Sequence, residues 1–361
     1  MEPARTGLLP IAGGPRLGIE DAQELWTPEG PYLNTASYGL PPRPAFEALQ
    51  NALADWRGGR TSWEHWGEST EGSRAAFARL VGVAVEEVAV SATVSELIGL
   101  AASSLPDGAR VLAPEIEFTS MLFPFMVHAE RGVEVATVPS DRLAEAIDAR
   151  TTLVAFSAVQ SATGEVADID AIIAAARHHG ALVALDATQA CGWLPLDASR
   201  VDFFACAAYK WLTSPRGTAF LAVRPEQLDS LRPLSAGWYA GEDPHTSYYG
   251  PPLRLARSAR RLDTSPAWFS WVGTQPALEL IERIGVESIH EHDVGLANRF
   301  RAGLGLEAAD SAIVSAEVAG AEPALERAGI QASVRAGSLR AAFHIYNTEA
   351  DVDETLTVLV G

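Results

Sequence analysis

From about residue 70 onward, the sequence repeats one pattern in which a short apolar run is followed by a stretch with helical periodicity. The clearest helical stretch covers residues 170–179, with Asp170 as its expected N-cap and Gly180 as its stop. Short, nearly continuous apolar strands that alternate with helices are typical of a parallel sheet covered on both faces. The pattern therefore predicts an α/β fold with a mostly parallel sheet. Its strands are expected at residues 88–90, 110–113, 133–138, 152–158, 181–186, 201–205 and 218–223.

The alternation of apolar runs and helical stretches ends near residue 246. An arginine-rich loop follows, then a helical pattern at residues 276–284 and shorter elements. We expect two domains, because a chain of 361 residues is long enough for one large and one small core. Residues 32–245 would form the large domain that contains the sheet. Residues 1–31 and 246–361 would form a smaller α+β domain.

Composition excludes several classes of partner. Lysine and arginine number 27 against 46 acidic residues, and the resulting net charge of −19 disfavours nucleic acid and anionic lipid as partners. No apolar run reaches the roughly 20 residues of a membrane span, and the N-terminus lacks a signal-peptide pattern, so a cytoplasmic protein is expected. Cys191 and Cys206 are the two cysteines, too few for a disulfide framework or a metal cluster.

Ligands of a sheet of this kind bind outside the carboxyl ends of its strands. Asp186 closes the apolar run ALVALD, and Lys210 follows the apolar run VDFFACA within YKWL. Asp186 is interpreted either as a cap of the next helix or as a carboxylate that keeps a pyridine nitrogen protonated. Lys210 is either a lysine that reaches out to solvent or an amine whose pKa is lowered by burial, which favours Schiff-base formation.

Two further strand ends carry candidate binding residues. Residues 91–96 (SATVSE) join a strand to a helix, where hydroxyls and backbone N–H groups suit a phosphate, although a simple N-cap explains them as well. Phe118 follows another strand and is either a core residue or a ring that stacks on a flat ligand. Together with Asp186 and Lys210, these features occur in the order that an enzyme dependent on pyridoxal 5′-phosphate (PLP) needs. That order is a phosphate site, a stacking ring, an acid for the pyridine nitrogen and a lysine.

With these residues, the chain resembles the fold-type I PLP enzymes of the class V aminotransferase group, which includes cysteine desulfurases, isopenicillin-N epimerase-like proteins and kynureninases. The resemblance runs from YLNTASYG at residues 32–39 to FHIYNTEADVD at residues 343–353. Its most specific part is DATQ, whose Gln189 is followed 21 residues later by the lysine of YKWL. The resemblance implies PLP as the cofactor and a PLP fold of type I, with a large domain and a smaller C-terminal domain.

The resemblance also implies roles for individual residues. Lys210 would hold the cofactor as a Schiff base, Asp186 would contact its ring nitrogen and Gln189 its phenolic oxygen. The remaining implied contacts are Thr93, Val94 and Ser95 to the phosphate, Phe118 stacked on the ring, Tyr209 beside the lysine, and Arg340, Asn34 and Ser161 around the substrate carboxylate. Ser265, in RRLDTSPAW, would reach the phosphate of the neighbouring subunit, which implies a homodimer with shared active sites.

Departures from the family pattern narrow the function. Desulfurases carry a nucleophilic cysteine shortly before the final arginine, whereas this chain has the shortened, cysteine-free stretch GIQASVRAGSLR at residues 329–340. A desulfurase that forms a protein persulfide is therefore not expected. Ala207 and Ala208 stand where a serine is frequent, and Ser161 stands where desulfurases have asparagine, so the grip on the carboxylate differs.

The favoured interpretation is a carbon–sulfur β-lyase that acts on a cysteine S-conjugate in small-molecule biosynthesis. The planar guanidinium group of Arg340 is suited to binding the substrate carboxylate through two hydrogen bonds. Once the proton on Cα has been removed, a good leaving group at Cβ departs. The alternatives are a class V aminotransferase, or a decarboxylating deaminase that uses oxygen, acting on a similar substrate. A non-catalytic, PLP-binding regulatory module is disfavoured by the net charge of −19 and by the lack of a DNA-binding segment.

Overall fold

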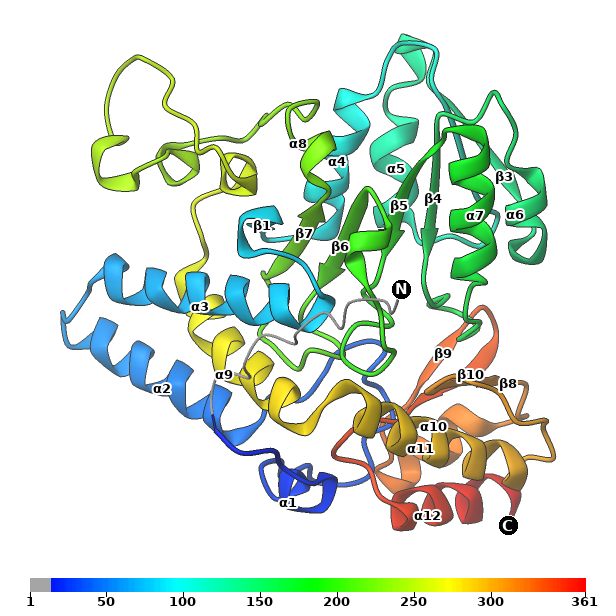
Figure 1. Ribbon diagram of the computed structural model, residues 1–361. Helices are drawn as coiled ribbons and strands as arrows, with labels where there is room; N and C mark the ends of the chain where they lie inside the picture. The colour runs from blue at the N-terminus through cyan, green and yellow to red at the C-terminus, as the bar shows by residue number, and fades with distance from the viewer. Residues whose placement is uncertain (1–13) are drawn as a thin grey trace, which may run out of the picture.

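The computed structural model describes residues 14–361, and Figure 1 shows a large sheet, a small sheet and the helices around them. Residues 1–13 of the expected small domain lie outside the described residues. The large sheet has seven strands in the order β1-β7-β6-β5-β4-β2-β3. These strands are β1 (Val88–Ser91), β2 (Arg110–Pro114), β3 (Glu134–Val138), β4 (Leu153–Ser157), β5 (Leu182–Asp186), β6 (Phe203–Ala207) and β7 (Ala219–Val223).

The large sheet is mostly parallel, as predicted, and all seven expected strands are present. The pairs β2–β3, β2–β4, β4–β5 and β5–β6 are parallel. Strand β7 is the exception, since it pairs antiparallel with both β6 and β1. Because two antiparallel steps restore the original direction, β1 ends at the same edge of the sheet as the parallel strands.

Helices cover both faces of the large sheet. One face is covered by α4 (Val94–Ser104) and α5 (Thr119–Met126), and the other by α3 (Trp63–Val81), α7 (Ile169–His179) and α9 (Trp268–Ile284). Successive strand residues point to opposite faces, so in β4 Leu153 packs with α4 and α5 while Val154 packs with the other group. Burial on both faces is the reason that β1, β2, β4, β5, β6 and β7 are nearly continuous apolar runs in the sequence, whereas the edge strand β3 is only partly buried.

The N-cap predicted for α7 is wrong by two residues. Asp168, rather than Asp170, precedes the helix, and its side chain accepts a hydrogen bond from the backbone N–H of Ala171 at 3.0 Å. Asp170 lies in the first turn and pairs with Arg200. Both acids fit the pattern, and spacing alone does not decide which of them caps. The predicted stop at Gly180 is confirmed, with a φ of 72°.

A second sheet, of three antiparallel strands, has the order β8-β10-β9. It consists of β8 (Ile313–Ala316), β9 (Ser333–Arg335) and β10 (Ser338–Ala342), with helices α10 (Val286–Gly303), α11 (Ala321–Ala328) and α12 (Glu349–Val360). The N-terminal segment contacts this part of the chain, because Gln23 Nε2 donates to the carbonyls of Ile345 at 3.0 Å and Asn347 at 2.8 Å. The boundaries of the two domains stay a prediction; α9, expected in the small domain, packs against α2 (Arg43–Arg57) and α3.

Short elements complete the fold. They are α1 (Ile19–Gln23), α6 (Leu143–Ala146), α8 (Pro225–Leu228), and the 3₁₀ helices η1 (Val85–Glu87), η2 (Ala129–Arg131), η3 (Ser140–Arg142), η4 (Ala198–Arg200), η5 (Trp238–Ala240), η6 (Pro244–Thr246) and η7 (Ala259–Leu262). Across residues 14–361, no helix is both long and apolar enough to cross a membrane. The same range contains no group of three His, Cys, Asp or Glu side chains that could hold a metal ion.

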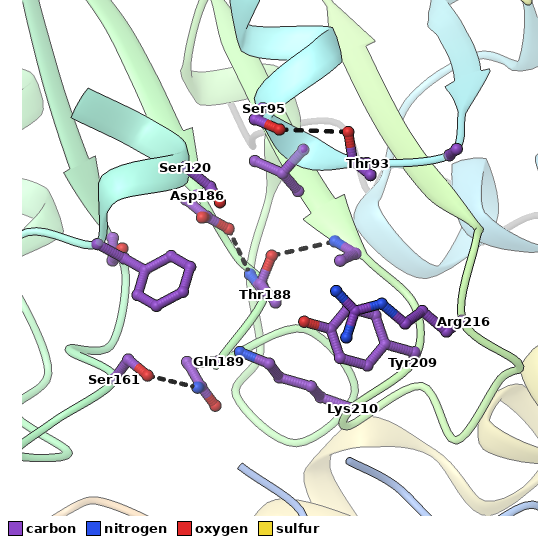
Figure 2. A pocket seen from close by; sticks show the side chains of 15 residues that line it. Thr93, Ser95, Ser120, Ser161, Asp186, Thr188, Gln189, Tyr209, Lys210 and Arg216 are labelled. Carbon is purple, nitrogen blue, oxygen red and sulfur yellow. Dashed lines mark hydrogen bonds between the residues drawn. The ribbon is translucent and has the colours of Figure 1, made fainter. Parts of the chain in front are cut away.

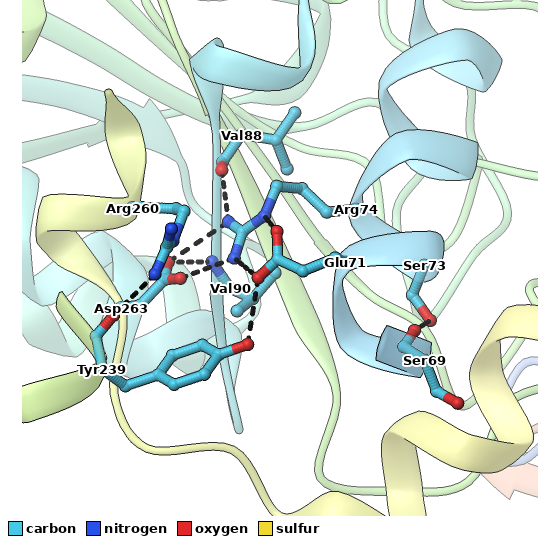
Figure 3. Close-up of polar contacts among 9 residues, drawn as sticks. All are labelled: Ser69, Glu71, Ser73, Arg74, Val88, Val90, Tyr239, Arg260 and Asp263. Atoms are coloured by element: carbon cyan, nitrogen blue, oxygen red, sulfur yellow. Dashed lines mark hydrogen bonds and ion pairs between the residues drawn. The ribbon is translucent and has the colours of Figure 1, made fainter. Parts of the chain in front are cut away.

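Strand β1 is an edge of the large sheet, and side chains satisfy its outer backbone groups (Figure 3). Arg74 Nη1 donates to the carbonyl of Val88 at 2.6 Å, and Asp263 Oδ1 accepts from the N–H of Val90 at 2.8 Å. Arg74 and Asp263 are themselves buried and pair at 2.6 Å. Although burial opposes it, the carboxylates of Asp263 and Glu71 raise the pKa of Arg74. This buried ion pair blocks the edge and holds β1 where it leads into α4.

Candidate active site

A cavity of about 160 Å³ lies at the carboxyl edge of the large sheet, beyond the ends of β1, β2, β5 and β6 (Figure 2). It is lined by Ala92, Thr93, Val94, Ser95, Phe118, Ser120, Ser157, Ser161, Asp186, Thr188, Gln189, Ala207, Tyr209, Lys210 and Arg216. All four strand ends singled out in the sequence therefore meet at one cavity. Three predicted site residues, Asn34, Ser265 and Arg340, are not part of its lining.

Lys210 lies in the turn after β6 and is 6% exposed, so the alternative of a lysine that reaches out to solvent is wrong. Burial lowers the pKa of its ε-amine from 10.5 to about 8, with the charge of Asp186 opposing and that of Arg340 adding to this effect. The Nζ atom lies 5.6 Å from the centroid of the Phe118 ring and 5.7 Å from that of Tyr209. Near neutral pH such an amine has a much larger neutral, nucleophilic fraction than an ordinary lysine.

The backbone around Lys210 is held tightly. Gly39 N donates to the carbonyl of Tyr209 at 2.9 Å, and a Cβ atom on Gly39 would overlap the carbonyl of Lys210. The loop continues through Thr213, whose φ of 50° is unusual for a β-branched residue. Backbone strain of this kind persists only where the surroundings over-determine the conformation, and it is common in functional loops.

Asp186 is 5% exposed, and its Oδ1 accepts a hydrogen bond from the N–H of Thr188 at 2.8 Å. Residues 188–193 form turns and no helix follows Asp186 directly, so the alternative of a helix cap is wrong. Burial raises the pKa of Asp186, while the hydrogen bonds from Thr188 and the charge of Lys210 oppose this rise. A cationic or N–H group bound in the cavity would offset the cost of burying this carboxylate.

Gln189 connects three parts of the site. Its Nε2 donates to the carbonyl of Ala36 at 2.9 Å and to Ser161 Oγ at 3.0 Å, and its Oε1 accepts from Trp211 Nε1 at 2.9 Å. Both amide hydrogens are therefore used. A contact from Gln189 to the phenolic oxygen of PLP, as the resemblance implies, stays a prediction and would require Gln189 to release Ser161 or Ala36.

The N-terminus of α4 forms the polar end of the cavity. Thr93 is the N-cap, and its Oγ1 accepts from the N–H of Glu96 at 3.3 Å and lies 3.3 Å from Ser95 Oγ. The N–H groups of Val94 and Ser95 belong to the first turn of α4, where backbone N–H groups have no acceptor within the helix. Their direction and the helix dipole favour an anion here, as expected for a phosphate.

Phe118 is 45% exposed and lines the cavity, so the alternative of a core residue is wrong. Its backbone N–H donates to Oε1 of Glu117 at 2.7 Å. Glu117 is buried and also accepts from the N–H of Ser157 at 2.7 Å and from Gln160 Nε2 at 3.0 Å. Burial raises the pKa of Glu117 despite these hydrogen bonds. The network fixes the start of α5 and with it the position of the Phe118 ring.

Arg340 is 2% exposed and reaches the cavity through Ser161. Its Nη1 donates to the carbonyl of Ser161 at 2.5 Å and to Ser161 Oγ at 3.2 Å, and its Nη2 donates to Ser37 Oγ at 2.7 Å. Burial lowers its pKa to about 10, and the charge of Arg335 adds to this effect. Within residues 14–361 Arg340 contacts no carboxylate, and the acid that follows it in the chain, Glu349, pairs with Arg299 instead.

The other two predicted residues, Asn34 and Ser265, also lie outside the cavity lining. Asn34 forms a backbone bridge with Ala342, two residues after Arg340, and its buried Oδ1 has no partner within residues 14–361. An unpaired buried acceptor is what a ligand N–H would satisfy. Ser265 is exposed in the loop before α9. Its contact with the phosphate of a neighbouring subunit, and the homodimer itself, stay predictions.

Sequence reasoning missed two features of the site. Arg216 lines the cavity, with its Cζ 4.9 Å from the centroid of the Tyr209 ring. The sequence feature that could have indicated this residue is the TSPRG segment that follows the lysine loop. Thr188 connects two strands, since its N–H donates to Asp186 and its Oγ1 accepts from the N–H of Ala207 at 3.0 Å. Composition also points to Lys210, because it is the single lysine in the sequence.

Sequence comparison relates most of the chain to one family. The family model described as aminotransferase class-V matches residues 32–306. An uncharacterized aminotransferase, YcbU, of Bacillus subtilis is 30% identical over 342 residues, which are 89% of this chain and 91% of the relative. The kynureninase of Stenotrophomonas maltophilia is 30% identical over 85% of this chain and 78% of its own length. Isopenicillin N epimerase of Streptomyces clavuligerus is 30% identical over 71% of this chain and 70% of its own length.

Solved structures agree on the fold. The cystine C–S lyase C-DES in complex with its product cysteine persulfide has a TM-score of 0.83 at 22% identity, over 92% of this chain and 97% of that chain. The apo cysteine desulfurase of Thermococcus onnurineus has a TM-score of 0.79 at 22% identity, over 91% of this chain and 94% of that chain. The predicted architecture, a mostly parallel sheet between helices with a smaller α+β part, is confirmed.

Proposed function

The chain belongs to the class-V aminotransferase family and is a PLP-dependent enzyme, and we propose that it cleaves the carbon–sulfur bond of a cysteine S-conjugate in small-molecule biosynthesis. The observation that carries this proposal is the position of the two thiols. Cys191 and Cys206 are buried in the core, 3% and 0% exposed, and neither lines the cavity. Without a thiol to accept sulfur at the site, the sulfur would leave together with its substituent, as a β-lyase requires.

The residues around the cavity fit PLP. The buried carboxylate of Asp186 needs a cationic partner, the start of α4 at Thr93 suits a phosphate, and Lys210 is an amine of lowered pKa in the same cavity. When bound, PLP supplies a protonated pyridine ring that withdraws electrons from Cα of the substrate. Arg216 and Ser120, also in the lining, add a charge and a hydroxyl to the polar surface. Phe118 offers an exposed ring face on one side of the cavity.

Asp186, Lys210 and Arg340 each have a separate role in the proposed reaction. Asp186 would keep the pyridine nitrogen protonated, since a carboxylate in a buried site interacts strongly with an adjacent cation. Lys210 would hold the cofactor, and its free amine would take the proton from Cα and return a proton to the departing sulfur. Arg340 binds the α-carboxylate and thereby sets which bond at Cα is broken. Burial of Lys210 and Asp186 keeps bulk water away from these transfers.

A second candidate is an aminotransferase, which the relative from Bacillus subtilis favours by its name. The same residues would serve, because the outcome depends on the pocket around Cβ rather than on the cofactor contacts. A decarboxylating deaminase that uses oxygen is the third enzymatic alternative. These reactions differ in their products and in their co-substrates.

The test is to incubate the holoenzyme with a panel of cysteine S-conjugates and to identify the products by mass spectrometry. We expect pyruvate, ammonia and the free thiol in equal amounts, without any added keto acid, and no turnover by Lys210→Ala. A requirement for a keto acid would favour the aminotransferase, and release of carbon dioxide would favour the deaminase. Persulfide sulfur retained on Cys191 or Cys206 would contradict the proposal.

A further inference from the structure

Two arginines of the small sheet lie on one face of the hairpin formed by β9 and β10. In the register of this hairpin Ser333 pairs with Arg340 and Arg335 pairs with Ser338. Alternate residues of a strand share a face, so Arg335 and Arg340 are diagonal neighbours on the same side of the sheet. The hairpin turn is short, with Ala336 and Gly337 at positive φ of 49° and 85°.

The side chains of both arginines converge on Ser37. Arg335 Nη2 donates to Ser37 Oγ at 3.2 Å and Arg340 Nη2 donates to the same oxygen at 2.7 Å, so the two nitrogens lie within about 6 Å of each other. Arg335 makes one more contact, to the carbonyl of Val334 at 2.8 Å. Two guanidinium groups that share one hydroxyl repel each other unless an anion lies between or beside them.

No carboxylate among residues 14–361 takes this position. Among residues 14–361, the contacts of Arg335 and Arg340 are all to hydroxyl and carbonyl oxygens, although the chain has 46 acidic residues. The other deeply buried arginine, Arg74, pairs with both Asp263 and Glu71. A buried cation without a counter-ion is costly, and a site that binds an anionic ligand is the common reason for keeping one.

The charge of Arg335 acts on the site. It lowers the pKa of Arg340 and also that of Lys210, which places the guanidinium within electrostatic reach of the amine. Arg335 itself is exposed and Arg340 is buried. The exposed arginine therefore lies on the solvent side of the buried one, where the outer part of a substrate would extend.

We propose that Arg335 binds a second carboxylate, located on the sulfur-linked part of the substrate, so that the enzyme selects S-conjugates carrying one carboxylate at each end. Arg340 would bind the α-carboxylate and Arg335 the distal one, with Ser37 between them. The assignment of the distal carboxylate to the sulfur substituent rests on the proposed function; the two-anion site does not. A dicarboxylate of the right length would bind even if the enzyme broke a different bond.

Binding is measured first, with ligands that cannot react. The ligand 3-(carboxymethylthio)propionate has the skeleton of S-carboxymethylcysteine without the amine, and 3-(carbamoylmethylthio)propionate replaces its distal carboxylate with a neutral amide. We expect calorimetry on the holoenzyme to give at least tenfold tighter binding of the diacid. Arg335→Gln should reduce this preference to less than twofold, and Arg335→Lys should keep part of it. Arg57→Gln removes an exposed charge at the end of α2 and should keep the full preference.

Turnover is measured second, on S-carboxymethylcysteine and S-carbamoylmethylcysteine. We expect the ratio of kcat/KM values to follow the same pattern across the variants. Equal binding of diacid and amide by the unmodified enzyme would overturn the inference, even with efficient cleavage of both substrates. Selective, Arg335-dependent binding without cleavage of either compound would support the two-anion site and count against the proposed lyase function.

Discussion

Replacing Lys210 with methionine should stabilise the cofactor-free protein at neutral pH. The pKa of Lys210 is lowered from 10.5 to about 8 by burial, so protonating it in the folded protein costs free energy that the unfolded chain does not have to supply. Each pKa unit corresponds to about 1.36 kcal/mol, and the whole effect is therefore about 3 kcal/mol. Methionine has a similar length and carries no charge, so it removes this cost while it fills the same space.

The sign of the effect determines its pH dependence. Because the folded pKa lies below the unfolded one, the full cost is present below about pH 8, falls as the pH rises toward 10.5 and is absent above that value. We therefore expect Lys210→Met to raise the free energy of unfolding by about 3 kcal/mol at pH 7. The gain should shrink steadily between pH 8 and 10.5, relative to the unmodified cofactor-free protein.

Two measurements test this reasoning. Denaturant titrations of both cofactor-free proteins at pH 7, 9 and 10.5 give the gain directly. Because Lys210 is the only lysine, the rate at which an amine-directed reagent labels its peptide gives the pKa independently, with the midpoint expected near 8. A gain that is the same at every pH would show that packing, not charge, is responsible. A labelling midpoint above 10 would refute the lowered pKa itself.

Four further changes test other parts of the site and fold. Asp186→Asn should retain the cofactor, measured by its absorbance, yet lose most activity, since a neutral amide does not hold a pyridine nitrogen protonated; near-normal rates would contradict this role. Gly39→Ala should weaken PLP binding, measured by equilibrium dialysis, because the added Cβ overlaps the lysine loop; unchanged affinity would show that the loop yields. Asp263→Asn should lower the free energy of unfolding by about 3–5 kcal/mol in urea titrations, because it removes one partner of a buried ion pair, and a loss below about 1 kcal/mol would argue against a tight pair. If the site is shared in a dimer, mixing Lys210→Ala chains with Ser265→Ala chains should restore some activity over either parent; no recovery would count against sharing.

The strands of the large sheet could be predicted because burial on both faces leaves continuous apolar runs. The direction of a strand has no such signature, and β7 pairs antiparallel with its neighbours although its sequence, AFLAV, resembles that of the parallel strands. The start of a helix can be equally ambiguous in the sequence, because neighbouring residues can both suit the N-cap position. Asp168 and Asp170 both suit an N-cap, and the backbone of the preceding loop decides between them.

The candidate site was predictable where one rule applied, namely that ligands bind at the carboxyl ends of the strands. Asp186 and Lys210 followed from that rule, since each comes at the end of a strand. Contacts between distant segments did not, because no local pattern connects Ser37 to Arg335, which are 298 positions apart in the chain. The electrostatic environment of the lysine depends on such contacts and could be described only from the folded chain.

The distribution of basic residues bears on how the cofactor finds its place. Lysine and arginine together number 27, and Lys210 is the one lysine among them. A guanidinium group stays protonated at any ordinary pH, so arginines do not compete for an aldehyde, whereas a surface lysine would. Apart from the terminal amine, the folded chain thus presents the aldehyde of PLP with a single amine, and that amine has a lowered pKa inside the cavity that suits the phosphate. Reduction of the holoenzyme with borohydride should therefore leave the pyridoxyl group on the peptide containing Lys210, and a label on any other peptide would mean that the cofactor is held elsewhere.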